Sequence, residues 1–343
     1  MTLNLVTGGS GYFGSLLVRN LLEAGEQCRI FDISDAADRP AGVELIRGDV
    51  RNLEDVRRAM IDVTVVHHNV AQVPLAKDHE LFESVNIGGT RNVLQAALET
   101  GVKKVVYTSS SAVFGVPKSN PVTEETVPKP GEAYGRAKLA GECVCQEFVD
   151  RGLDVTVVRP RTILGHGRLG IFQILFEWIY TGYNVPVLGK GDNLYQFVHA
   201  DDLAEACIRA GRRPGPTRYN FGTDRFGTMR QALEALCAHA MTGSKVRSVP
   251  MGPTAIGMRM CSAVGLAPLG PYHAMMYGRS LYFDISKAVR ELDFLPAYSN
   301  EEMLIQSYQW YLANRTRVLT ERGASHHRSA LKQGVLKIVK HLL

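Results

Sequence analysis

Tyr134 and Lys138 stand four positions apart in the segment YGRAKLAGE of this 343-residue chain. On a helix, this spacing places both side chains on one face. A nearby ammonium group favours phenolate over phenol and lowers a tyrosine pKa that is otherwise about 10. Such a tyrosine can exchange a proton with a hydroxyl or carbonyl group near neutral pH, so the pair predicts acid–base chemistry at a substrate oxygen.

The spacing Tyr-x-x-x-Lys also arises by chance, and a pair of surface side chains is the simpler interpretation of the motif alone. Three nearby hydroxyl residues favour the functional interpretation, because Ser109, Ser110 and Ser111 directly follow the apolar run at 104–108. That run is typical of a strand, and ligands bind at the carboxyl edge of parallel sheets. The serines are therefore expected to face the same site.

A glycine-rich turn, TGGSGYFG, contains Gly8, Gly11 and Gly14 between an expected strand and an expected helix. Glycine lets the backbone turn tightly and approach a pyrophosphate at the positive end of the helix. Asp32 ends the next expected strand, where its carboxylate can accept hydrogen bonds from ribose hydroxyls and repel a 2′-phosphate. The pattern predicts a dinucleotide site that prefers NAD to NADP, a preference that the nearby Arg39 moderates.

The elements that must position these residues alternate between strand and helix through the first half of the chain. Six apolar segments are expected to be strands: Leu3–Thr7, Gln27–Phe31, Val43–Arg47, Val63–His67, Lys104–Thr108 and Val155–Arg159. The alternation predicts an α/β protein with a Rossmann-type, doubly wound parallel sheet covered by helices on both faces. After Pro160 strands and helices no longer alternate regularly. Later helices are expected at Ile171–Tyr180, Asp202–Ala210, Met229–Ala240 and Glu301–Ala313.

This pattern divides the chain into three parts. Residues 1–160 are expected to form an NAD(P)-binding Rossmann domain, to which residues 195–225 return. Residues 161–194 and 226–315 are expected to form a smaller, mixed substrate-binding region. Residues 316–343 form a basic amphipathic tail.

Composition excludes several classes of protein. Hydrophobic residues make up 45% of the chain and charged residues 21%, which are ordinary values for a chain that can fill a core. The net charge of +5 is too weak to indicate a nucleic-acid partner, and much of it lies in the tail. The six cysteines form no CxxC pair, which favours buried free thiols in a reducing compartment. Without a signal peptide or an apolar run long enough to span a membrane, the expected location is the cytoplasm.

Further motifs follow in a fixed order: GDV at 48–50, NVAQ at 69–72, VNIGGTRNVL at 85–94, SSSAVFG at 109–115, VRPRTILG at 158–165 and QFVHADDLAEA at 196–206. Together with TGGSGYFG and YGRAK, they make residues 3–313 resemble the extended short-chain dehydrogenase/reductases, also described as NAD-dependent epimerases and dehydratases. The resemblance implies that Ser110 polarises the substrate oxygen and that Tyr134 is the acid/base. It also implies that Lys138 binds the nicotinamide ribose and tunes Tyr134.

The resemblance extends to the cofactor and the oligomeric state. It implies that NAD contacts Gly8, Gly11, Tyr12, Phe13, Gly14, Asp32, Asp49, Val50, Val70, Ala71, Tyr134, Lys138 and Pro160. Relatives often form homodimers through helices that correspond to residues 86–100 and 133–149, so a homodimer is expected.

Several other polar residues are expected to be structural. Asn86 precedes a helix and could cap it, and His199 is expected to be structural, with Asp201 or Asp202 capping the helix that follows. The adjacent pairs His67-His68 and His326-His327 cannot converge on one ion within a strand or helix. No metal ion is therefore expected.

Two departures weigh against the nucleotide-sugar epimerases, the largest branch of this family. Members that act on UDP-sugars usually carry an Asn in an LRYFN-like segment, where this chain has Arg159-Pro160-Arg161-Thr162. They also usually carry an Arg just before an aromatic-Val-His segment, where this chain has Tyr195-Gln196. Tyrosine cannot replace the forked cation with which arginine recognises phosphate. Arg161 or Arg279 could still supply part of a diphosphate site, which keeps the epimerase or dehydratase alternative open.

The RPxxIxG form and the stretch GKGDNLYQFVHADD look more like the 3β-hydroxysteroid and sterol dehydrogenase branch, and a bacterial ceramide-pathway reductase for a 3-oxo lipid is a suspected match. The leading hypothesis is hydride transfer between nicotinamide and a secondary alcohol or ketone of a lipid-like substrate. Candidate substrate residues are Ser111, Arg161, Tyr195 and Arg279, and the methionine-rich stretch at 250–280 could wall an apolar pocket. A second alternative, a cofactor-binding scaffold without turnover, is disfavoured by the intact Ser110, Tyr134 and Lys138.

The tail supplies a further hypothesis. Leu331, Val335, Ile338, Val339 and Leu342 fall on one helical face, with lysines elsewhere around the helix. Such a segment can lie flat on an anionic bilayer, so residues 324–343 predict peripheral contact with the inner face of the membrane. Docking of the tail onto its own domain or onto a dimer partner is the alternative.

Overall fold

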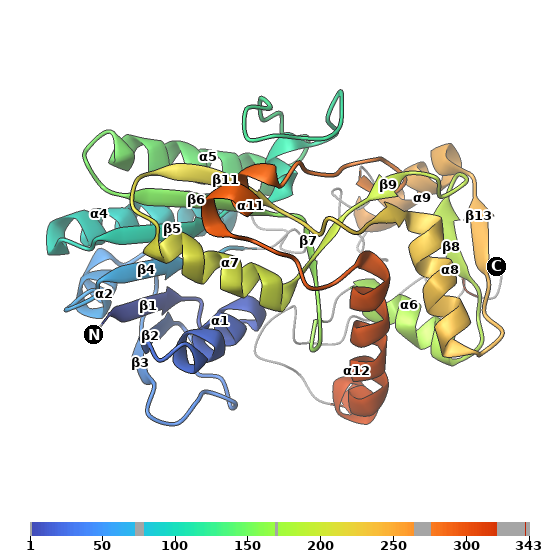
Figure 1. Cartoon of the computed structure of the whole chain (residues 1–343), viewed down its shortest axis with the longest axis horizontal. Helices are drawn as coiled ribbons and strands as arrows, with labels where there is room; N and C mark the ends of the chain where they lie inside the picture. Colours follow the sequence, from blue (N-terminus) through green and yellow to red (C-terminus); the bar gives the residue numbers. More distant parts are fainter. Residues whose placement is uncertain (1, 73–78, 169–170, 264–275, 321–339, 341–343) are drawn as a thin grey trace.

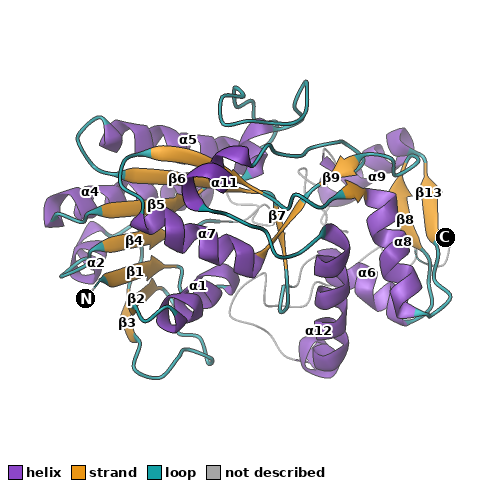
Figure 2. Ribbon diagram, in the orientation of Figure 1, coloured by secondary structure: helices purple, strands orange, loops and turns teal. Residues whose placement is uncertain are grey.

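The computed structural model describes residues 2–72, 79–168, 171–263, 276–320 and 340. Its centre is a seven-stranded sheet in the order β11-β6-β5-β4-β1-β2-β3, and each neighbouring pair is parallel. The strands are β1 (Leu3–Thr7), β2 (Gln27–Asp32), β3 (Glu44–Arg47), β4 (Val65–His68), β5 (Lys104–Thr108), β6 (Val155–Pro160) and β11 (Thr217–Phe221). Figures 1 and 2 show helices on both sides of this sheet. The predicted Rossmann-type doubly wound fold is confirmed.

The central strands are buried on both faces, because helices cover the sheet twice. All four residues of β4 and all six residues of β6 are buried. The edge strand β3 is instead half-buried or exposed throughout. Burial therefore falls from the middle of the sheet to this edge, as the sequence pattern requires.

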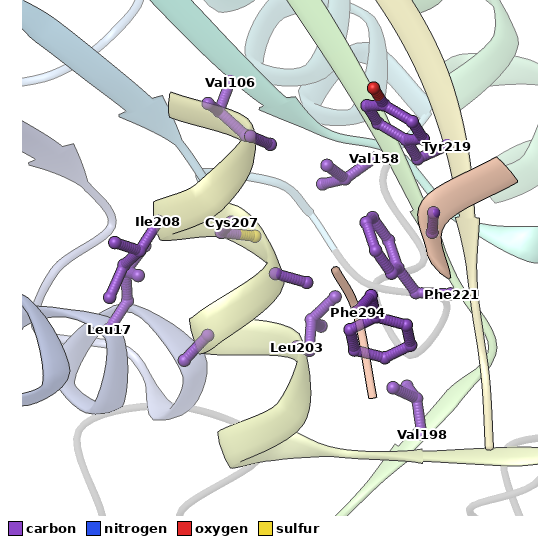
Figure 3. Packing of buried hydrophobic residues seen from close by; sticks show 14 of the residues in the cluster. Leu17, Val106, Val158, Val198, Leu203, Cys207, Ile208, Tyr219, Phe221 and Phe294 are labelled. Carbon is purple, nitrogen blue, oxygen red and sulfur yellow. The ribbon is translucent and has the colours of Figure 1, made fainter. Parts of the chain in front are cut away.

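Two helical layers sandwich the sheet. One consists of α2 (Leu53–Ala59), α4 (Thr90–Thr100) and α5 (Ala133–Val149), whose apolar faces share a core with Val105 and Tyr107 of β5. The other consists of α1 (Tyr12–Glu23), α7 (Ala200–Arg212) and α11 (Ser286–Leu292). Figure 3 shows how Leu17 of α1 and Ile208 of α7 meet beneath the sheet.

Several helix ends lie where local chemistry places them. Asn52 caps α2 by accepting a hydrogen bond from the backbone N–H of Glu54 at 3.0 Å. Gly101 ends α4 in the left-handed conformation, with φ of 74°. The helix α7 begins at Ala200, two residues before the expected start, because the side chain of His199 caps it. The expectation that Asp201 or Asp202 would provide this cap is therefore wrong.

A second region adjoins the carboxyl edge of the sheet. It contains α6 (Ile171–Tyr180), α8 (Met229–Ala240), α9 (Met251–Ala263), α12 (Asn300–Thr320) and the parallel pair β8 (Val185–Leu188) and β13 (Val246–Val249). The core of this region contains several aromatic residues, including Phe176, Trp178, Tyr308 and Tyr311. Figure 1 shows α6, α8 and β13 together at the opposite end of the molecule from β3.

Two short strand pairs connect the regions: β7 (Thr162–Leu164) with β10 (Phe197–His199), and β9 (Leu194–Tyr195) with β12 (Gly227–Thr228). The helix α11 lies within the range 226–315 that was expected to bind substrate, yet it packs against the sheet. Its buried residues Ala288 and Leu292 join the same core as Phe221 of β11. In the described part of the chain, no helix combines the length and apolar character that crossing a membrane requires.

Candidate active site

The glycine-rich turn joins β1 to α1 at the carboxyl edge of the sheet. Gly8 has φ of 70°, a conformation that other residues rarely adopt, and the N–H of Gly11 donates to the carbonyl of Gly8 at 3.0 Å. A Cβ atom on Gly14 would lie 2.1 Å from the same carbonyl oxygen. No side chain caps the start of α1. The start of this helix therefore suits an anion such as the pyrophosphate of NAD.

Asp32 lies beside this turn, at the end of β2. Its carboxylate accepts hydrogen bonds from the N–H groups of Ser10 at 3.1 Å and Ser34 at 3.2 Å, which fix its orientation. Burial raises the pKa of Asp32, and these hydrogen bonds counteract part of that rise. Arg39 does not turn toward Asp32 but pairs with Asp35, Nε to Oδ1 at 3.0 Å. Arg39 is therefore engaged elsewhere, which fits NAD better than NADP.

The other predicted cofactor residues lie on neighbouring strand ends. Val70 follows β4 and packs against the glycine turn, since a Cβ on Gly8 would lie 3.3 Å from it. Val50 follows β3 and is buried beneath α4, whereas Asp49 pairs with Arg51. Ala71 follows Val70 in a half-buried loop.

Asn86 fastens this loop. It lies in a π-helical turn (Ser84–Gly89) between α3 (His79–Glu83) and α4, not at a helix start. Its Oδ1 accepts from the N–H of Gln72 at 2.7 Å, and its Nδ2 donates to the carbonyl of Gln72 at 3.3 Å. The expected helix cap is therefore wrong, because the amide group matches both backbone groups of the loop at once.

The predicted catalytic residues come from two elements at the same edge. Ser110 follows β5 and caps a 3-10 helix at Ser111–Phe114, accepting from the N–H of Ala112 at 3.2 Å. Tyr134 lies in the first turn of α5, where Glu132 accepts from its N–H at 2.7 Å. Lys138 lies one turn later, and its ammonium group donates to the carbonyl of Thr108 at 2.7 Å. Ser110 lies close enough to Tyr134 to lower the pKa of its hydroxyl group.

The electrostatics of Tyr134 differ from the expectation. Removal from water raises its pKa to about 12, and the interaction with Ser110 and the charge of Arg168 offset only part of this rise. Burial also lowers the pKa of Lys138 to about 8. The predicted lowering of the Tyr134 pKa by Lys138 is therefore wrong for the protein on its own, because the lysine bonds to the backbone of β5 and desolvation dominates both groups.

Two buried arginines at the end of β6 hold the serine segment 109–111 in place through hydrogen bonds. Arg159 binds Glu142 of α5 through two hydrogen bonds, Nε to Oε1 at 2.9 Å and Nη2 to Oε2 at 2.6 Å. Glu142 also accepts from the hydroxyl of Ser109 at 2.5 Å. Arg161 donates through Nη1 to the hydroxyl of Ser111 at 2.9 Å. Ser110 thus lies between two serines that buried arginines hold in place, Ser109 through Glu142 and Ser111 directly.

The sequence interpretation missed Glu142, Arg159 and Arg168. Glu142 follows Lys138 by one helical turn, a spacing that could have placed it on the same buried face. Arg168 lies in the loop after β7, with its guanidinium carbon 5.3 Å from the centre of the Tyr12 ring. Tyr12 is buried, and its hydroxyl donates to the carbonyl of His166 in that loop.

Three of the four candidate substrate residues lie together. The guanidinium carbon of Arg161 lies 4.8 Å from the centre of the Tyr195 ring and, through Nη1, touches Ser111. Arg279 is exposed, and its described hydrogen bonds run through its backbone, to Met276 and Asn193. Pro160 ends β6 beside Phe221, and Phe13 packs against the α1–α7 core. The methionine-rich stretch and the tail lie partly outside the described residues.

One group of potential metal ligands occurs in the described ranges: His166, His199 and Asp201. Nδ1 of His199 accepts from the N–H of Asp201 at 3.2 Å, and Nε2 lies 2.5 Å from Oε1 of Gln306. Both ring nitrogens of His199 are thus engaged, so this histidine serves the start of α7 rather than an ion.

Fold and geometry define the class: a Rossmann-type dinucleotide-binding enzyme with serine, tyrosine and lysine side chains at the carboxyl edge of its sheet. The family model described as "NAD dependent epimerase/dehydratase family" matches residues 4–222. The chain belongs to this family and is an NAD-dependent enzyme. The glycine turn fits this cofactor, because the space a Cβ would occupy is already filled by backbone.

Similar proteins span the range of the family. An uncharacterized protein, y4nG, of Sinorhizobium fredii is 54% identical over 340 residues, covering 99% of this chain and 86% of that protein. A 3 beta-hydroxysteroid dehydrogenase/Delta 5-->4-isomerase of Mycobacterium tuberculosis is 28% identical, covering 96% and 95%. The solved UDP-glucose 4-epimerase of Thermus thermophilus in complex with NAD is 25% identical with a TM-score of 0.74, covering 91% of this chain and 99% of that one. Dehydrogenases and epimerases are thus both similar to this chain.

Proposed function

We propose that this enzyme transfers a hydride between NAD and a secondary alcohol or ketone of a lipid-like substrate. Ser110, Tyr134 and Lys138 are the proposed catalytic residues. The glycine turn, Asp32 and the loop at Val70 are proposed to hold the cofactor, which supplies or accepts the hydride when bound.

The proposed roles of these residues follow from their chemistry and from their shared position at the carboxyl edge of the sheet. In the reducing direction, the hydroxyls of Ser110 and Tyr134 donate to the substrate carbonyl oxygen, and the Tyr134 proton passes to that oxygen as the carbon receives the hydride. In the oxidising direction, Tyr134 takes the proton from the alcohol. Lys138 lies one helical turn away, held by the carbonyl of Thr108, and is proposed to bind the nicotinamide ribose. Fixed donors of this kind stabilise the charge that develops on oxygen in the transition state.

A single contact carries the choice of a lipid-like substrate over a nucleotide sugar. Thr162 and Tyr195 stand in the two segments where UDP-sugar enzymes usually carry Asn and Arg. Here their hydroxyl groups are hydrogen-bonded to each other at 2.8 Å, and Tyr195 is buried. The neighbouring Gln196 is used internally, with Nε2 donating to the carbonyl of Thr223 at 2.7 Å and Oε1 accepting from the N–H of Phe283 at 2.9 Å. In this chain, the side chains in these two segments thus use their polar groups within the protein and do not offer them to a diphosphate.

An assay of cofactor oxidation tests the proposal. Purified protein with NADH is expected to reduce long-chain 3-oxo lipids or 3-oxosteroids, and Tyr134→Phe is expected to abolish the reaction while retaining NAD. Robust interconversion of UDP-glucose and UDP-galactose, without turnover of any lipid ketone, would refute this choice in favour of the epimerase alternative. Similarity to the Thermus thermophilus epimerase makes those sugars the appropriate competitor substrates.

We further infer a homodimer formed through α4 and α5. The two helices pack side by side in one outer layer and are linked by the pair Arg91–Glu147, with Nη1 to Oε2 at 2.7 Å. Cys143 of α5 is exposed on this layer. Light scattering on the purified protein is expected to give twice the mass of the chain. A monomer at micromolar concentration would contradict the inference.

The segment 324–343 is proposed to bring the enzyme to the inner face of the membrane. Of this segment the structure describes Lys340, whose ammonium group lies 4.2 Å from the centre of the Tyr183 ring. Full-length protein is expected to float with vesicles that contain anionic lipid, and a chain truncated after Glu321 is expected to sediment. Equal behaviour of the two proteins would instead favour docking of the tail onto its own second region.

A further inference from the structure

Arg161 carries a buried positive charge that is incompletely satisfied. The residue is 1% exposed, and only Nη1 has a hydrogen-bond partner, the hydroxyl of Ser111. Among the described residues, Nε and Nη2 have no partner and no carboxylate forms an ion pair with this guanidinium. Buried polar groups are nearly always hydrogen-bonded, and arginine stays charged in proteins. An open pair of donors on a buried cation therefore indicates a ligand.

The open donors are the two that recognise a carboxylate elsewhere in the same molecule. Arg159 binds Glu142 through Nε and Nη2, and Arg315 binds Glu177 through the same two atoms at 2.8 and 2.6 Å. These two N–H groups point the same way and match the two oxygens of a carboxylate. Arg161 presents the same edge, while Nη1, on the far side, is used by Ser111.

The surroundings of Arg161 hold the guanidinium in place. Its central carbon lies 4.8 Å from the centre of the Tyr195 ring and 5.7 Å from that of Phe283, so aromatic rings contact it as cation–π partners. These contacts and the bond to Ser111 leave little rotational freedom to the side chain. A guanidinium fixed before binding loses less entropy on forming two hydrogen bonds.

Arg161 is also close to the proposed chemistry. It follows Pro160, at the carboxyl end of β6, and bonds to Ser111, the residue after Ser110. Its backbone N–H donates to the carbonyl of Phe221 at 2.9 Å, which fixes this position at the edge of the sheet.

We propose that the Nε and Nη2 edge of Arg161 binds a carboxylate carried by the substrate, a few bonds from the carbon–oxygen group held by Ser110 and Tyr134. This assignment rests on the proposed function and narrows its substrate class to hydroxy and oxo carboxylic acids with an apolar remainder. The carboxylate completes the hydrogen bonding of a cation that the fold leaves open. A substrate that lacks the anion leaves those donors buried and unpaired, which selects against it.

Matched acids and esters test this without any mutation. The probes are long-chain 3-oxo, 4-oxo and 5-oxo carboxylic acids, their methyl esters, and an alkyl phosphate of similar length, each added to the full-length chain with NADH. For the acid whose spacing fits, KM is expected to be about ten- to a hundred-fold lower than for its ester, the range for a charge-assisted two-point contact. Equal KM values for acid and ester at every spacing would overturn the proposal while leaving lipid-ketone reduction intact.

Variants and a binding readout separate the two hypotheses. Arg161→Lys, which keeps the charge but loses the fork, is expected to raise KM for the acid much more than KM for the ester, so that the preference for the acid is lost. The control Arg315→Lys is expected to change neither. Thermal stabilisation of the NAD-loaded protein by the acid, reduced in Arg161→Lys, supports the carboxylate site even if no substrate is turned over. Absence of stabilisation by any acid, equal losses for acid and ester, or stronger stabilisation by the alkyl phosphate would each overturn it.

Discussion

The cofactor side and the substrate side of the sheet edge differ in how their charged groups are satisfied. On the cofactor side, Asp32 accepts from two backbone N–H groups, and Arg39 is engaged by Asp35. On the substrate side, Arg161 is buried with two open donors. On the cofactor side, the charged side chains have hydrogen-bond partners, and the glycine turn remains open to an anion. On the substrate side, the charge of Arg161 has no counter-ion among the described residues. This contrast fits the proposal that substrate recognition depends on individual side chains such as Arg161.

The largest expected effect is on the chemistry at Tyr134. Tyr134→Phe removes the group that transfers the proton, and general acid–base catalysis typically contributes about 10²–10⁴-fold. We therefore expect kcat to fall by about that factor while the Kd for NAD changes little, because the glycine turn is untouched. Stopped-flow reduction and NAD titration measure the two quantities. A parallel loss of NAD binding would show that Tyr134 serves cofactor binding as well as the chemical step.

The next largest effect is expected where the buried charge of Arg159 is paired with the carboxylate of Glu142. Glu142→Gln leaves Arg159 buried without its counter-ion, and breaking such a pair costs about 3–5 kcal/mol. Urea unfolding is expected to show this loss, together with lower activity, since Glu142 also holds Ser109. The matched control is Glu147→Gln, which breaks an exposed pair on the same helix and is expected to cost about 0–1 kcal/mol. Equal losses in the two variants would contradict the account.

On the cofactor side, the sharpest change is Gly14→Ala. Its Cβ would lie 2.1 Å from the carbonyl oxygen of Gly8, so the turn must shift. Overpacking of this kind costs about 1–3 kcal/mol, and the shift is expected to weaken NAD binding. Gly252→Ala, at a glycine where a Cβ would meet nothing within 4 Å, serves as the control and is expected to retain NAD binding. Unchanged NAD affinity in Gly14→Ala would contradict the claim that the close-packed backbone of the glycine turn is needed to bind NAD.

The smallest expected effect concerns acid pH. Burial lowers the pKa of His67 to about 4 and that of His68 to about 3, from an ordinary value of 6.5. Below pH 6.5 the unfolded chain binds these protons before the folded protein does, so stability falls as pH falls toward the folded-state values. Each histidine contributes up to about 1.4 kcal/mol per pH unit in that window. Unfolding at pH 7.5 and pH 5.5 measures it, and equal stability at both values would contradict the assignment.

The cofactor side could be predicted from the sequence because local rules determine it. The glycines of TGGSGYFG and the position of Asp32 at a strand end depend on short-range backbone geometry, and the structure places them as expected. Helices α5, α6 and α8 begin and end at the expected residues for the same reason.

The substrate side could be predicted only in part, because contacts distant in sequence decide it. Ser111 and Arg161 are 50 residues apart, and nothing local shows that they bond. Likewise, Asn86 fastens a loop 14 residues away instead of capping a helix. The direction of the Tyr134 pKa shift was missed because spacing on a helix reports proximity to Lys138 but not desolvation.

Transfer of isotope tests the central claim most directly. Protein supplied with NADH deuterated at the transferable position and with a long-chain 3-oxo lipid is expected to yield an alcohol that carries deuterium on the carbinol carbon. Tyr134→Phe is expected to yield almost none. Product alcohol without deuterium, or interconversion of UDP-sugars as the sole activity, would contradict hydride transfer to a lipid ketone at this site.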